Sequence, residues 1–444
     1  MAINQFQDFF REHGITEVEC VVPDMTGVAR GKILPKSQFN SANMRLPKAV
    51  LIQTVTGDWP DDDEITGPTD PDMVCVPDIN TTRLVPWAPD PTALVIHDCV
   101  HFDGSPVSIS PRYVLRKILK LYEERGWKPV VAPELEFYLV ERNIDPDIPL
   151  KPPIGRTGRA ETGRMSYSID AVNEFDPYFE DVYEYSDAMR LDVDTLIHEV
   201  GAGQMEINFV HGDALDLADR VFLFKRVVRE TALRHNIYAT FMAKPMQEEP
   251  GSAMHIHQSI VDKEGNNVFS NADGGPSSLF LSYVAGLQRY MPAVMPIMAP
   301  FVNSYRRLSR FTAAPINLQW GYDNRTVGIR VPNSGPEARR VENRVPGVDV
   351  NPYLAMAATL ACGYLGMVKG LKPSAPMVTS GYDLDYELPR HLEDAIELMR
   401  DSADIAEVFG ADFVNAFCAV KEKEYDTFFR VISSWERSHL LLNV

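Results

Sequence analysis

Cysteine is scarce in this chain of 444 residues, and the five that occur are scattered along it (Cys20, Cys75, Cys99, Cys362 and Cys418). None of them stands in a C-x-x-C or C-x-x-H spacing, so the sequence indicates neither a disulfide framework nor a zinc knuckle. Such use of cysteine is typical of proteins kept in a reducing compartment.

A long apolar run is also missing. The longest stretch, Tyr353 to Val368, is interrupted by Gly363 and Gly366 and is shorter than the roughly 20 residues that a membrane span needs. It is expected to form a buried helix. The N-terminal residues have no basic region followed by an apolar core, which argues against a secretory signal peptide. Together these absences predict a soluble, cytoplasmic protein.

Positive charge is under-represented, because 43 Lys and Arg stand against 62 Asp and Glu, a formal net charge of −19. A protein this acidic repels phosphate backbones and anionic lipid surfaces at long range. Nucleic-acid and membrane partners are therefore not expected.

Three common enzyme motifs are absent too. The chain contains no G-x-x-x-x-G-K-[ST] loop, no G-x-G-x-x-G after a strand and no G-x-S-x-G turn. The first absence excludes a P-loop enzyme. The other two leave a nicotinamide-binding fold and a serine-hydrolase elbow without support.

The length predicts two or three domains, and 45% hydrophobic with 24% charged residues is ordinary for a chain that buries a large core. The mixture of strand and helix signals predicts an α+β protein with a boundary near residue 105. We expect a small β-rich N-terminal domain over residues 1–105 and a larger catalytic domain over residues 106–444.

Local signals indicate several individual elements. Residues 15–35 fit two strands joined by a turn at 24–27, and residues 57–73, rich in Gly, Pro and acids, fit a loop. Helices are expected over residues 111–126 and, with a long amphipathic pattern, over residues 214–235. The acidic C-terminal part is expected to be mostly helical.

Four predicted strands carry a polar face that exposure to solvent does not explain. Alternate residues of a strand point to the same side, and the polar residues that share a side are Glu134 with Glu136, Glu206 with Asn208, His255 with His257 and Ser259, and Arg340 with Glu342 and Arg344. One such strand alone would fit any half-buried sheet, but strand faces in solvent usually include Lys, and these have none.

Together with Glu199, which precedes a Gly-Ala-Gly turn, these strands gather five glutamates that repel one another unless cations bind. Carboxylates with a single histidine ligand suit Mg²⁺ or Mn²⁺ better than zinc.

A second group of residues is basic. Residues 301–350 contain eight arginines and no lysine against four acidic residues, so this segment is locally +4. The forked guanidinium group recognises carboxylates and phosphates through paired hydrogen bonds. Ion pairs on the surface could account for Arg310 and Arg339, but less readily for Arg325 and Arg330, which flank a strand-like run. Divalent cations beside an anion-binding arginine cluster predict phosphoryl transfer to a small anionic substrate.

Six stretches, in order along the chain, resemble the glutamine synthetase family: PELEF (133–137), HEVGAGQMEI (198–207), GSAMHIHQS (251–259), NSYRRL (303–308), NRTVGIRVP (324–332) and RRVENRVPGVDVNPYLAMAA (339–358). The early DMTGVARGK (24–32) also resembles the family's N-terminal β-grasp module. The resemblance implies a β-grasp-like N-terminal domain and a glutamine-synthetase-type catalytic domain with a curved antiparallel sheet. It also implies a homo-oligomer, a dodecamer of two hexameric rings, with active sites between neighbouring chains.

The resemblance further implies ATP, L-glutamate and two or more Mg²⁺ or Mn²⁺ ions at each site. One metal ion would be bound by Glu136, Glu199 and Glu206, and a second by Glu134, His255 and Glu342. The glutamate site would include Gly251, Arg307 and Arg344. ATP and the transferred phosphate would be served by His257, Ser259, Arg325 and Arg330. The residues expected to carry the catalysis are Arg325, Arg307 and Glu134.

The chain departs from the family at the ammonium site, which true glutamine synthetases build from two acidic side chains. One of these acids falls on about Ile52, with Thr54 close by, and the other, on a flap, falls on Ala313. Because a small cationic nucleophile needs a negative, closed pocket, we expect a larger primary amine and a γ-glutamylamide product. This is the pattern of the γ-glutamylpolyamine synthetase branch.

The sequence does not decide whether the amine substrate is a monoamine or a polyamine. Ile52, Thr54 and Ala313 are apolar enough for an alkyl or aromatic monoamine, whereas the acidic run over residues 58–64 could hold the second ammonium of a polyamine, unless it is a solvated loop. Two rivals remain. One is an authentic glutamine synthetase that uses other acids. The other, a catalytically silent binding protein, is disfavoured because every candidate metal ligand is retained.

Overall fold

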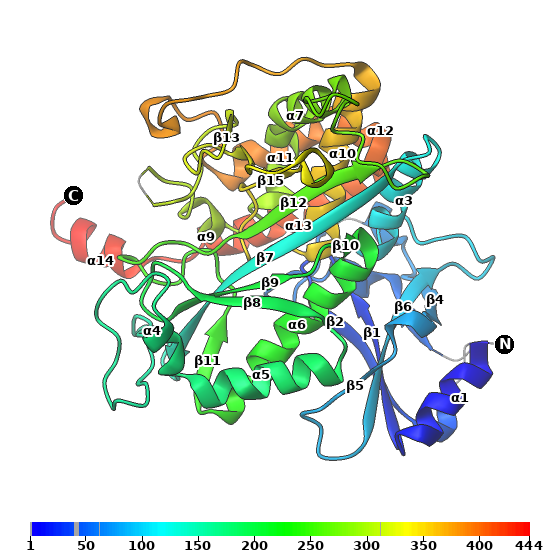
Figure 1. The fold of residues 1–444 in the computed structure, drawn as a ribbon. Helices are drawn as coiled ribbons and strands as arrows, with labels where there is room; N and C mark the ends of the chain where they lie inside the picture. Colours follow the sequence, from blue (N-terminus) through cyan, green and yellow to red (C-terminus); the bar gives the residue numbers. More distant parts are fainter. Residues whose placement is uncertain (1, 40–43, 62, 311) are drawn as a thin grey trace.

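The computed structural model describes residues 2–39, 44–61, 63–310 and 312–444, which form two β-sheets with helices packed around them (Figure 1). The first sheet has the strand order β2-β1-β6-β4-β3, with β5 beside β6. Its strands are β1 (Glu17–Pro23), β2 (Ala29–Pro35), β3 (Arg45–Pro47), β4 (Asp72–Pro77), β5 (Arg83–Leu84) and β6 (Thr92–Val100).

The second sheet has the order β13-β14-β15-β12-β7-β9-β8, with β10 and β11 also paired to β7. All these pairs are antiparallel except β13 with β14. Its strands are β7 (Lys128–Glu141), β8 (Val193–His198), β9 (Gln204–Phe209), β10 (Gly212–Asp213), β11 (Ile237–Thr240), β12 (Met254–Val261), β13 (Trp320–Tyr322), β14 (Ile329–Val331) and β15 (Val341–Asn343). The long strand β7 runs through the middle of the molecule in Figure 1.

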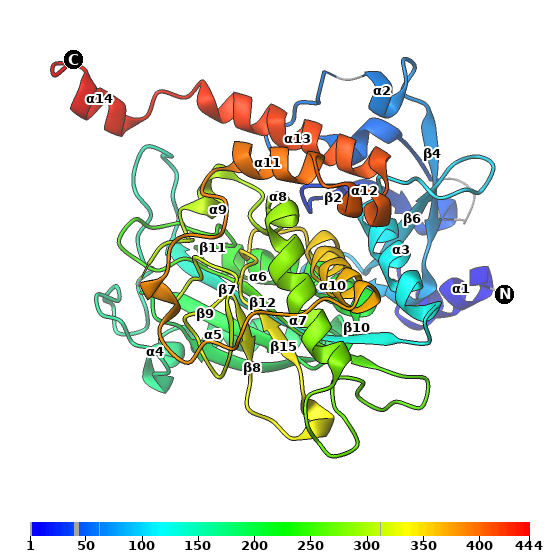
Figure 2. The same cartoon turned by 90° about the horizontal axis from the view of Figure 1, so that it is seen from above.

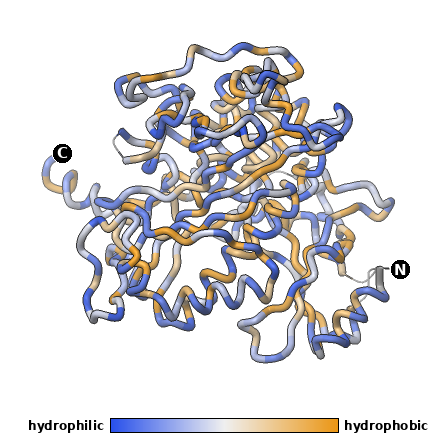
Figure 3. The backbone as a smooth tube through the Cα atoms, viewed as in Figure 1, coloured by the Kyte–Doolittle hydropathy of each residue, from blue (hydrophilic) through white to orange (hydrophobic). Residues whose placement is uncertain are grey.

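The helices of the described residues are α1 (Ala2–Glu12), α2 (Asp63–Thr66), α3 (Pro111–Glu123), α4 (Ile169–Asn173), α5 (Asp176–Ala188), α6 (Ala214–Arg234), α7 (Ser278–Tyr290), α8 (Met295–Met298), α9 (Val302–Tyr305), α10 (Pro352–Lys369), α11 (Leu392–Arg400), α12 (Ala403–Phe409), α13 (Ala411–Phe429) and α14 (Ser434–Leu440). Helix α10 packs against α7, α3 and α6, and α11 lies along α13 (Figure 2). The hydrophobic segments follow the central strands, whereas α5, on the outside, alternates hydrophobic and hydrophilic residues (Figure 3).

The predicted α+β architecture is confirmed, and so are several elements. Strands β1 and β2 pair as an antiparallel hairpin from Glu17↔Pro35 to Pro23↔Ala29, and Gly27 takes a left-handed φ of 82° in the turn, which glycine adopts without a steric penalty. The predicted helices over 111–126 and 214–235 are α3 and α6. The predicted domain boundary near residue 105 falls between β6 and α3 and stays a prediction.

The apolar run that begins at Tyr353 forms α10, whose residues from Pro352 to Met367 are all buried. The helix starts at Asn351, whose side chain accepts hydrogen bonds from the backbone N–H groups of Tyr353 and Leu354. Among the residues that the structure describes, no helix is both long enough and apolar enough to cross a membrane.

The predicted loop over residues 57–73 is wrong in two details, because it contains the short helix α2 and its last two residues begin strand β4. The helix lies between Pro60 and Pro68, where no proline interrupts the chain. It ends before Gly67, which has a left-handed φ of 86°, the conformation that commonly terminates helices.

A buried arginine joins the first sheet to the helices of the second. Arg112, on α3, forms ion pairs with Asp78 at 2.7 Å and Asp98 at 2.6 Å, both contributed by the N-terminal part of the chain. It also pairs with Asp219 of α6 at 2.8 Å, and the Tyr353 hydroxyl donates to the same carboxylate at 2.7 Å. This network fixes α3, α6 and α10 relative to the N-terminal strands.

Replacing Arg112 with Met is expected to lower the free energy of unfolding by about 3–5 kcal/mol, the usual loss when one partner of a buried ion pair is removed. Asp219 would stay buried with one hydroxyl donor in place of a guanidinium group. Denaturant-induced unfolding of the wild type and the variant measures this difference.

The matched control is Arg116→Met. Arg116 also pairs with Asp78 and Asp98, but its side chain is 41% exposed, so its loss should cost about 1 kcal/mol or less. Equal losses for the two variants would contradict the role assigned to Arg112.

Candidate active site

Strand β7 brings the predicted acidic residues together because both of its main neighbours are antiparallel to it. Glu134 lies opposite His255 of β12, and Glu136 lies opposite Glu206 of β9. Residues two apart on a strand share a face. The register therefore places these four side chains on the same side of the sheet, as the alternation in the sequence predicts.

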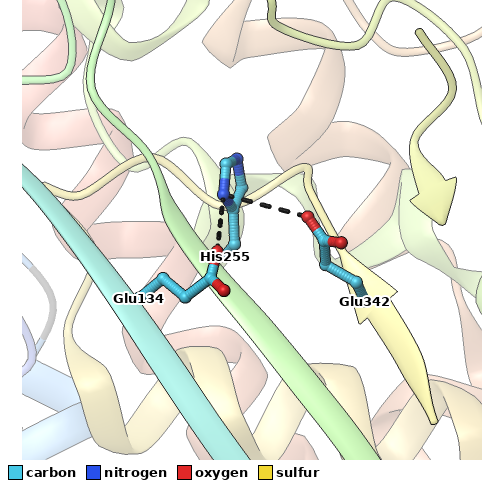
Figure 4. A group of neighbouring side chains, drawn as sticks. All are labelled: Glu134, His255 and Glu342. Carbon is cyan, nitrogen blue, oxygen red and sulfur yellow. Dashed lines mark hydrogen bonds and ion pairs between the residues drawn. The ribbon is translucent and has the colours of Figure 1, made fainter. Parts of the chain in front are cut away.

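Two groups of candidate metal ligands share His255. The ligand atoms of Glu134, His255 and Glu342 lie within 4.8 Å of one another, and so do those of Glu136, Glu206 and His255. Figure 4 shows the first group, in which His255 Nδ1 lies 3.3 Å from a Glu134 oxygen and 3.9 Å from a Glu342 oxygen. Carboxylate oxygens with one imidazole nitrogen are a suitable donor set for hard divalent cations.

Burial and mutual repulsion change the protonation of these carboxyl groups. Burial, reinforced by the charge of Glu199, raises the pKa of Glu136 to about 8. Burial, reinforced by Glu134, Glu136 and Glu199, raises the pKa of Glu206 to about 9. Without a cation, this pair of buried acids therefore holds protons at neutral pH, and a cation binding there would release them.

In the other ligand group both carboxyl groups are ionised. Burial works against the ionised form of Glu134, but hydrogen bonds with His255 and His257 outweigh it and hold the pKa of this carboxyl far below its ordinary value. The pKa of Glu342 is also lowered, because the effect of burial is outweighed by Arg344, His255 and His257 acting together. Burial, with Arg344 nearby, lowers the pKa of His255 to about 4, so this imidazole is neutral and able to bind a metal ion.

Glu199, predicted to bind the same metal ion as Glu136 and Glu206, lies in the turn between β8 and β9. Its backbone N–H donates to the Gln204 carbonyl at 2.8 Å. Glu199 is close enough to raise the pKa of Glu136, but the group of ligand atoms within 4.8 Å consists of Glu136, Glu206 and His255. Direct ligation by Glu199 stays a prediction.

Two predicted arginines converge on Glu342. Arg330 and Arg344 each donate to one of its carboxylate oxygens at 2.5 Å. Arg344 is 5% exposed, and its Nε atom is buried without a hydrogen-bond partner among the described residues. A buried donor without an acceptor costs free energy, so this atom marks a place where an anionic ligand would be favourable.

Arg307 is fixed next to Arg344. Its guanidinium group is buried and donates to the carbonyls of Val345 and Arg344, both at 2.8 Å. A Cβ atom added to Gly251 would lie only 2.5 Å from Arg307 Cγ, so only glycine allows this approach. The predicted glutamate-site residues Gly251, Arg307 and Arg344 are thus neighbours, beside the carboxylates.

A cavity of about 600 Å³ adjoins the ionised ligand group and is lined by Glu134, His257, Ser259 and Arg340 among others. Arg340 Nε donates to His257 Nδ1 at 3.2 Å, which leaves His257 Nε2 to donate to Glu134 at 2.8 Å. The predicted ATP residues His257 and Ser259 therefore share one cavity. Arg325 is exposed and, among the described residues, makes no hydrogen bond or ion pair with this cluster.

The three residues predicted for the amine pocket lie in two places. Ala313 is exposed, has a left-handed φ of 60°, and its carbonyl accepts from Arg344 at 3.3 Å. Ile52 and Thr54 are buried in the N-terminal part of the chain. The segment that follows them is tied to α13, because the Val55 N–H donates to Glu424 at 2.7 Å.

Gln204 was not predicted as a site residue. The Gln204 side-chain amide donates to Glu136 at 3.2 Å and to the Gly251 carbonyl at 3.1 Å, so it connects the metal ligands to the glycine beside Arg307. The signal was available in the sequence, because Gln204 stands two residues before Glu206 and shares its face.

Comparisons with known proteins agree with this geometry. A model of the glutamine synthetase catalytic domain matches residues 108–440. The chain is 35% identical to gamma-glutamylputrescine synthetase PuuA of Escherichia coli (strain K12), over 96% of this chain and 92% of that protein. It is 34% identical to a glutamate–isopropylamine ligase from a Pseudomonas species, over 99% and 98% of the two chains. The fold matches apo GmaS with a TM-score of 0.83 and 28% identity, over 98% of both chains.

The raised pKa values predict how pH acts on the protein without divalent cations. In the folded state Glu136 and Glu206 keep their protons up to about pH 8 and 9, whereas in the unfolded chain they ionise near the ordinary value of 4.5. The folded state therefore binds more protons across this range, and these two groups make the free energy of unfolding fall as the pH rises from 4.5 to 9.

Replacing Glu206 with Gln is expected to make the free energy of unfolding depend less on pH and to stabilise the metal-free protein at pH 8. It should also weaken Mg²⁺ or Mn²⁺ binding by at least the roughly tenfold that the loss of a supporting residue in a metal site causes. Denaturant unfolding at pH 6 and pH 8, with calorimetric metal titration, tests both effects. The control Glu264→Gln, on an exposed turn, should change neither the pH dependence of unfolding nor the affinity for the metal ion. A Glu206→Gln variant that matches the wild type in both would contradict the role of Glu206 as a buried metal ligand.

Proposed function

The chain belongs to the glutamine synthetase family, and from this premise we propose that it is an ATP-dependent ligase that joins the γ-carboxylate of L-glutamate to an organic primary amine. The reaction passes through γ-glutamyl phosphate and yields a γ-glutamylamide, ADP and phosphate. The observation that carries the proposal is the pair of ligand groups sharing His255, placed beside buried arginines, of which Arg344 has a donor without an acceptor among the described residues.

The residues around the site suit the two steps of this reaction. In the first step a γ-carboxylate oxygen of glutamate attacks the γ-phosphorus of ATP, and ADP leaves. Arg344 and Arg307 would hold glutamate, and Arg330 and Arg325 would stabilise the charge on the transferred phosphoryl group. In the second step the amine nitrogen attacks the acyl carbon, phosphate leaves, and the nitrogen loses its excess protons.

Divalent cations, Mg²⁺ or Mn²⁺, fit the two ligand groups, and when bound they would supply positive charge to the phosphate oxygens. Glu134, His255 and Glu342 would hold one ion, and Glu136 and Glu206 another, with Glu199 close by. We assign ATP to the cavity lined by His257 and Ser259, because this cavity adjoins Glu134 and is large enough for a small-molecule ligand.

An organic amine is favoured over ammonium because Ala313 occupies the flap position where true glutamine synthetases have an acidic residue. Its side chain places no carboxylate next to Arg344. Two similar proteins are a gamma-glutamylputrescine synthetase and a glutamate–isopropylamine ligase. Between a polyamine and a monoamine, the acidic run after residue 57 gives little support to the first. Asp61 is 91% exposed in its side chain and pairs with Lys423 at 2.8 Å, as expected of a solvated loop.

We also propose that a second copy of the chain completes the amine pocket. Among the described contacts, the segment after Thr54 is tied to α13 of its own chain rather than to the carboxylate cluster. If Ile52 and Thr54 act on an amine, they would therefore act at the site of a neighbouring chain, as in a homo-oligomeric ring.

The proposal is tested by phosphate release that depends on ATP, glutamate and Mg²⁺, measured with ammonium, putrescine, spermidine, isopropylamine and benzylamine. Release with the organic amines and little with ammonium is expected. Release with ammonium alone would establish a true glutamine synthetase, and no release with any amine would favour a binding protein.

Replacing Ala313 with Glu is expected to move the enzyme towards ammonium. A carboxylate beside Arg344 would restore negative charge for a small cation and fill the space that an alkyl tail needs. We expect the ratio of kcat/KM for ammonium to that for isopropylamine to rise about tenfold or more. Thr312→Glu adds the same charge one residue away and should leave the ratio nearly unchanged. A ratio that moves equally in both variants would show that only the added charge matters.

A further inference from the structure

Lys225, on α6, is a buried lysine that holds a segment of the chain beside the proposed glutamate site. Its side chain is buried, with the residue 8% exposed, and its ammonium group donates to the carbonyls of Val348 and Val350 at 2.6 and 2.9 Å. The nitrogen also lies 5.5 Å from the centre of the Phe241 ring. Because a buried ammonium group is costly unless its donors are paired, Lys225 and the two carbonyls fix one another in place.

The segment that Lys225 holds, residues 345–350, adjoins all three residues proposed for the glutamate site. Arg307 donates to the first carbonyl of the segment at 2.8 Å, and Arg344 immediately precedes the segment. The Val348 N–H donates at 3.1 Å to the carbonyl of the residue that follows Gly251. A displacement of the segment would therefore disturb both arginines and the glycine together.

Asp349 joins the same segment to Arg307 by a second route. Its carboxylate accepts a hydrogen bond from the Ser304 hydroxyl at 2.6 Å, and the Ser304 carbonyl accepts from the Arg307 N–H at 3.2 Å. A Cβ atom added to Gly347 would lie only 2.5 Å from the other carboxylate oxygen, so glycine leaves the space that this side chain occupies. Asp349 is thus confined between Ser304 and Gly347, and it couples the position of Arg307 to that of the segment.

We propose that Lys225 is a positioning residue for the glutamate site, which holds residues 345–350 and Asp349 so that Arg307, Arg344 and Gly251 keep their mutual arrangement. It acts through this segment rather than by contact with glutamate. The inference rests on the proposed glutamate–amine ligase function. Binding groups stay in place only when the residues behind them are fixed, and the cavity assigned to ATP is lined by other residues. The effect of Lys225 is therefore confined to glutamate.

The test replaces Lys225 with Met, which is apolar and of similar length. The two carbonyls then lose the donor that they share. Since a displacement of about 1 Å can cost about a hundredfold in rate, we expect kcat/KM for glutamate to fall about ten- to hundredfold, through a higher KM. The KM for ATP should change by about twofold or less. Calorimetric titration with L-glutamate, in the presence of Mg²⁺ and a non-hydrolysable ATP analogue, should show the same loss without turnover.

The matched control is Arg229→Met, one turn further along α6. The Arg229 guanidinium carbon lies 5.1 Å from the centre of the same Phe241 ring, whereas the hydrogen bonds to the segment come from Lys225. This variant removes the same charge from the same helix and should leave the KM for glutamate within about twofold of the wild-type value. Equal increases in the two variants would overturn the inference.

If Lys225→Met does not fold, two variants of Asp349 decide the question. Asp349→Ala removes the acceptor of the Ser304 hydroxyl and should raise the KM for glutamate about tenfold, the contribution of one hydrogen bond to a charged group. Asp349→Asn keeps an oxygen that can accept the same bond and should restore most of the affinity. An Asp349→Ala variant with the wild-type KM for glutamate would overturn the inference.

The outcomes also separate this inference from the proposed function. A wild type that releases no phosphate with any amine would overturn the function itself. An active wild type whose Lys225→Met variant keeps its KM for glutamate, or loses affinity for ATP and glutamate equally, would overturn the inference and leave the function standing.

Discussion

Repulsion between carboxylates that share one face of a sheet is the constraint on which the rest of the site depends. Antiparallel pairing of β7 with β9 and β12 forces Glu134, Glu136 and Glu206 onto one side, where burial leaves little water to screen their charges. The protein meets this constraint in two different ways. Glu342 is neutralised by Arg330 and Arg344, whereas Glu136 and Glu206 retain protons.

This division links the binding of cations to the binding of anions. In the proposed function, the guanidinium groups that compensate Glu342 would also hold the carboxylate and phosphate ligands. A cation bound near Glu342 would compensate the Glu342 carboxylate in place of Arg344. An anion bound by Arg344 would likewise compensate the guanidinium group in place of Glu342. Each ligand therefore lowers the cost of binding the other, and by linkage the effect is reciprocal. A site of this kind favours the complete set of ligands over any partial set.

The sequence predicted the features that depend on short-range geometry. Because side chains alternate on a strand, the shared faces of Glu134 with Glu136 and of His255 with His257 followed from spacing alone. It could not predict that His255 belongs to both ligand groups, since that depends on which strands pair and in what register. The contact between Arg344 and the Ala313 carbonyl was not predicted for a related reason, because only tertiary packing brings these two segments together.

The division between strands and loops also explains how one scaffold can serve different nucleophiles. The candidate ligands other than Glu199 are carried by strands of a single sheet, where a change in one side chain is felt by its paired neighbours. Ala313 stands on a flap outside the sheet, and its carbonyl accepts a hydrogen bond from Arg344. A substitution at this position would alter the shape and charge next to Arg344 without disturbing the register that holds the carboxylates. In the proposed function, phosphoryl transfer would therefore stay constant while the accepted amine changes, since the candidate metal ligands are on strands and the proposed selecting residue is on a loop.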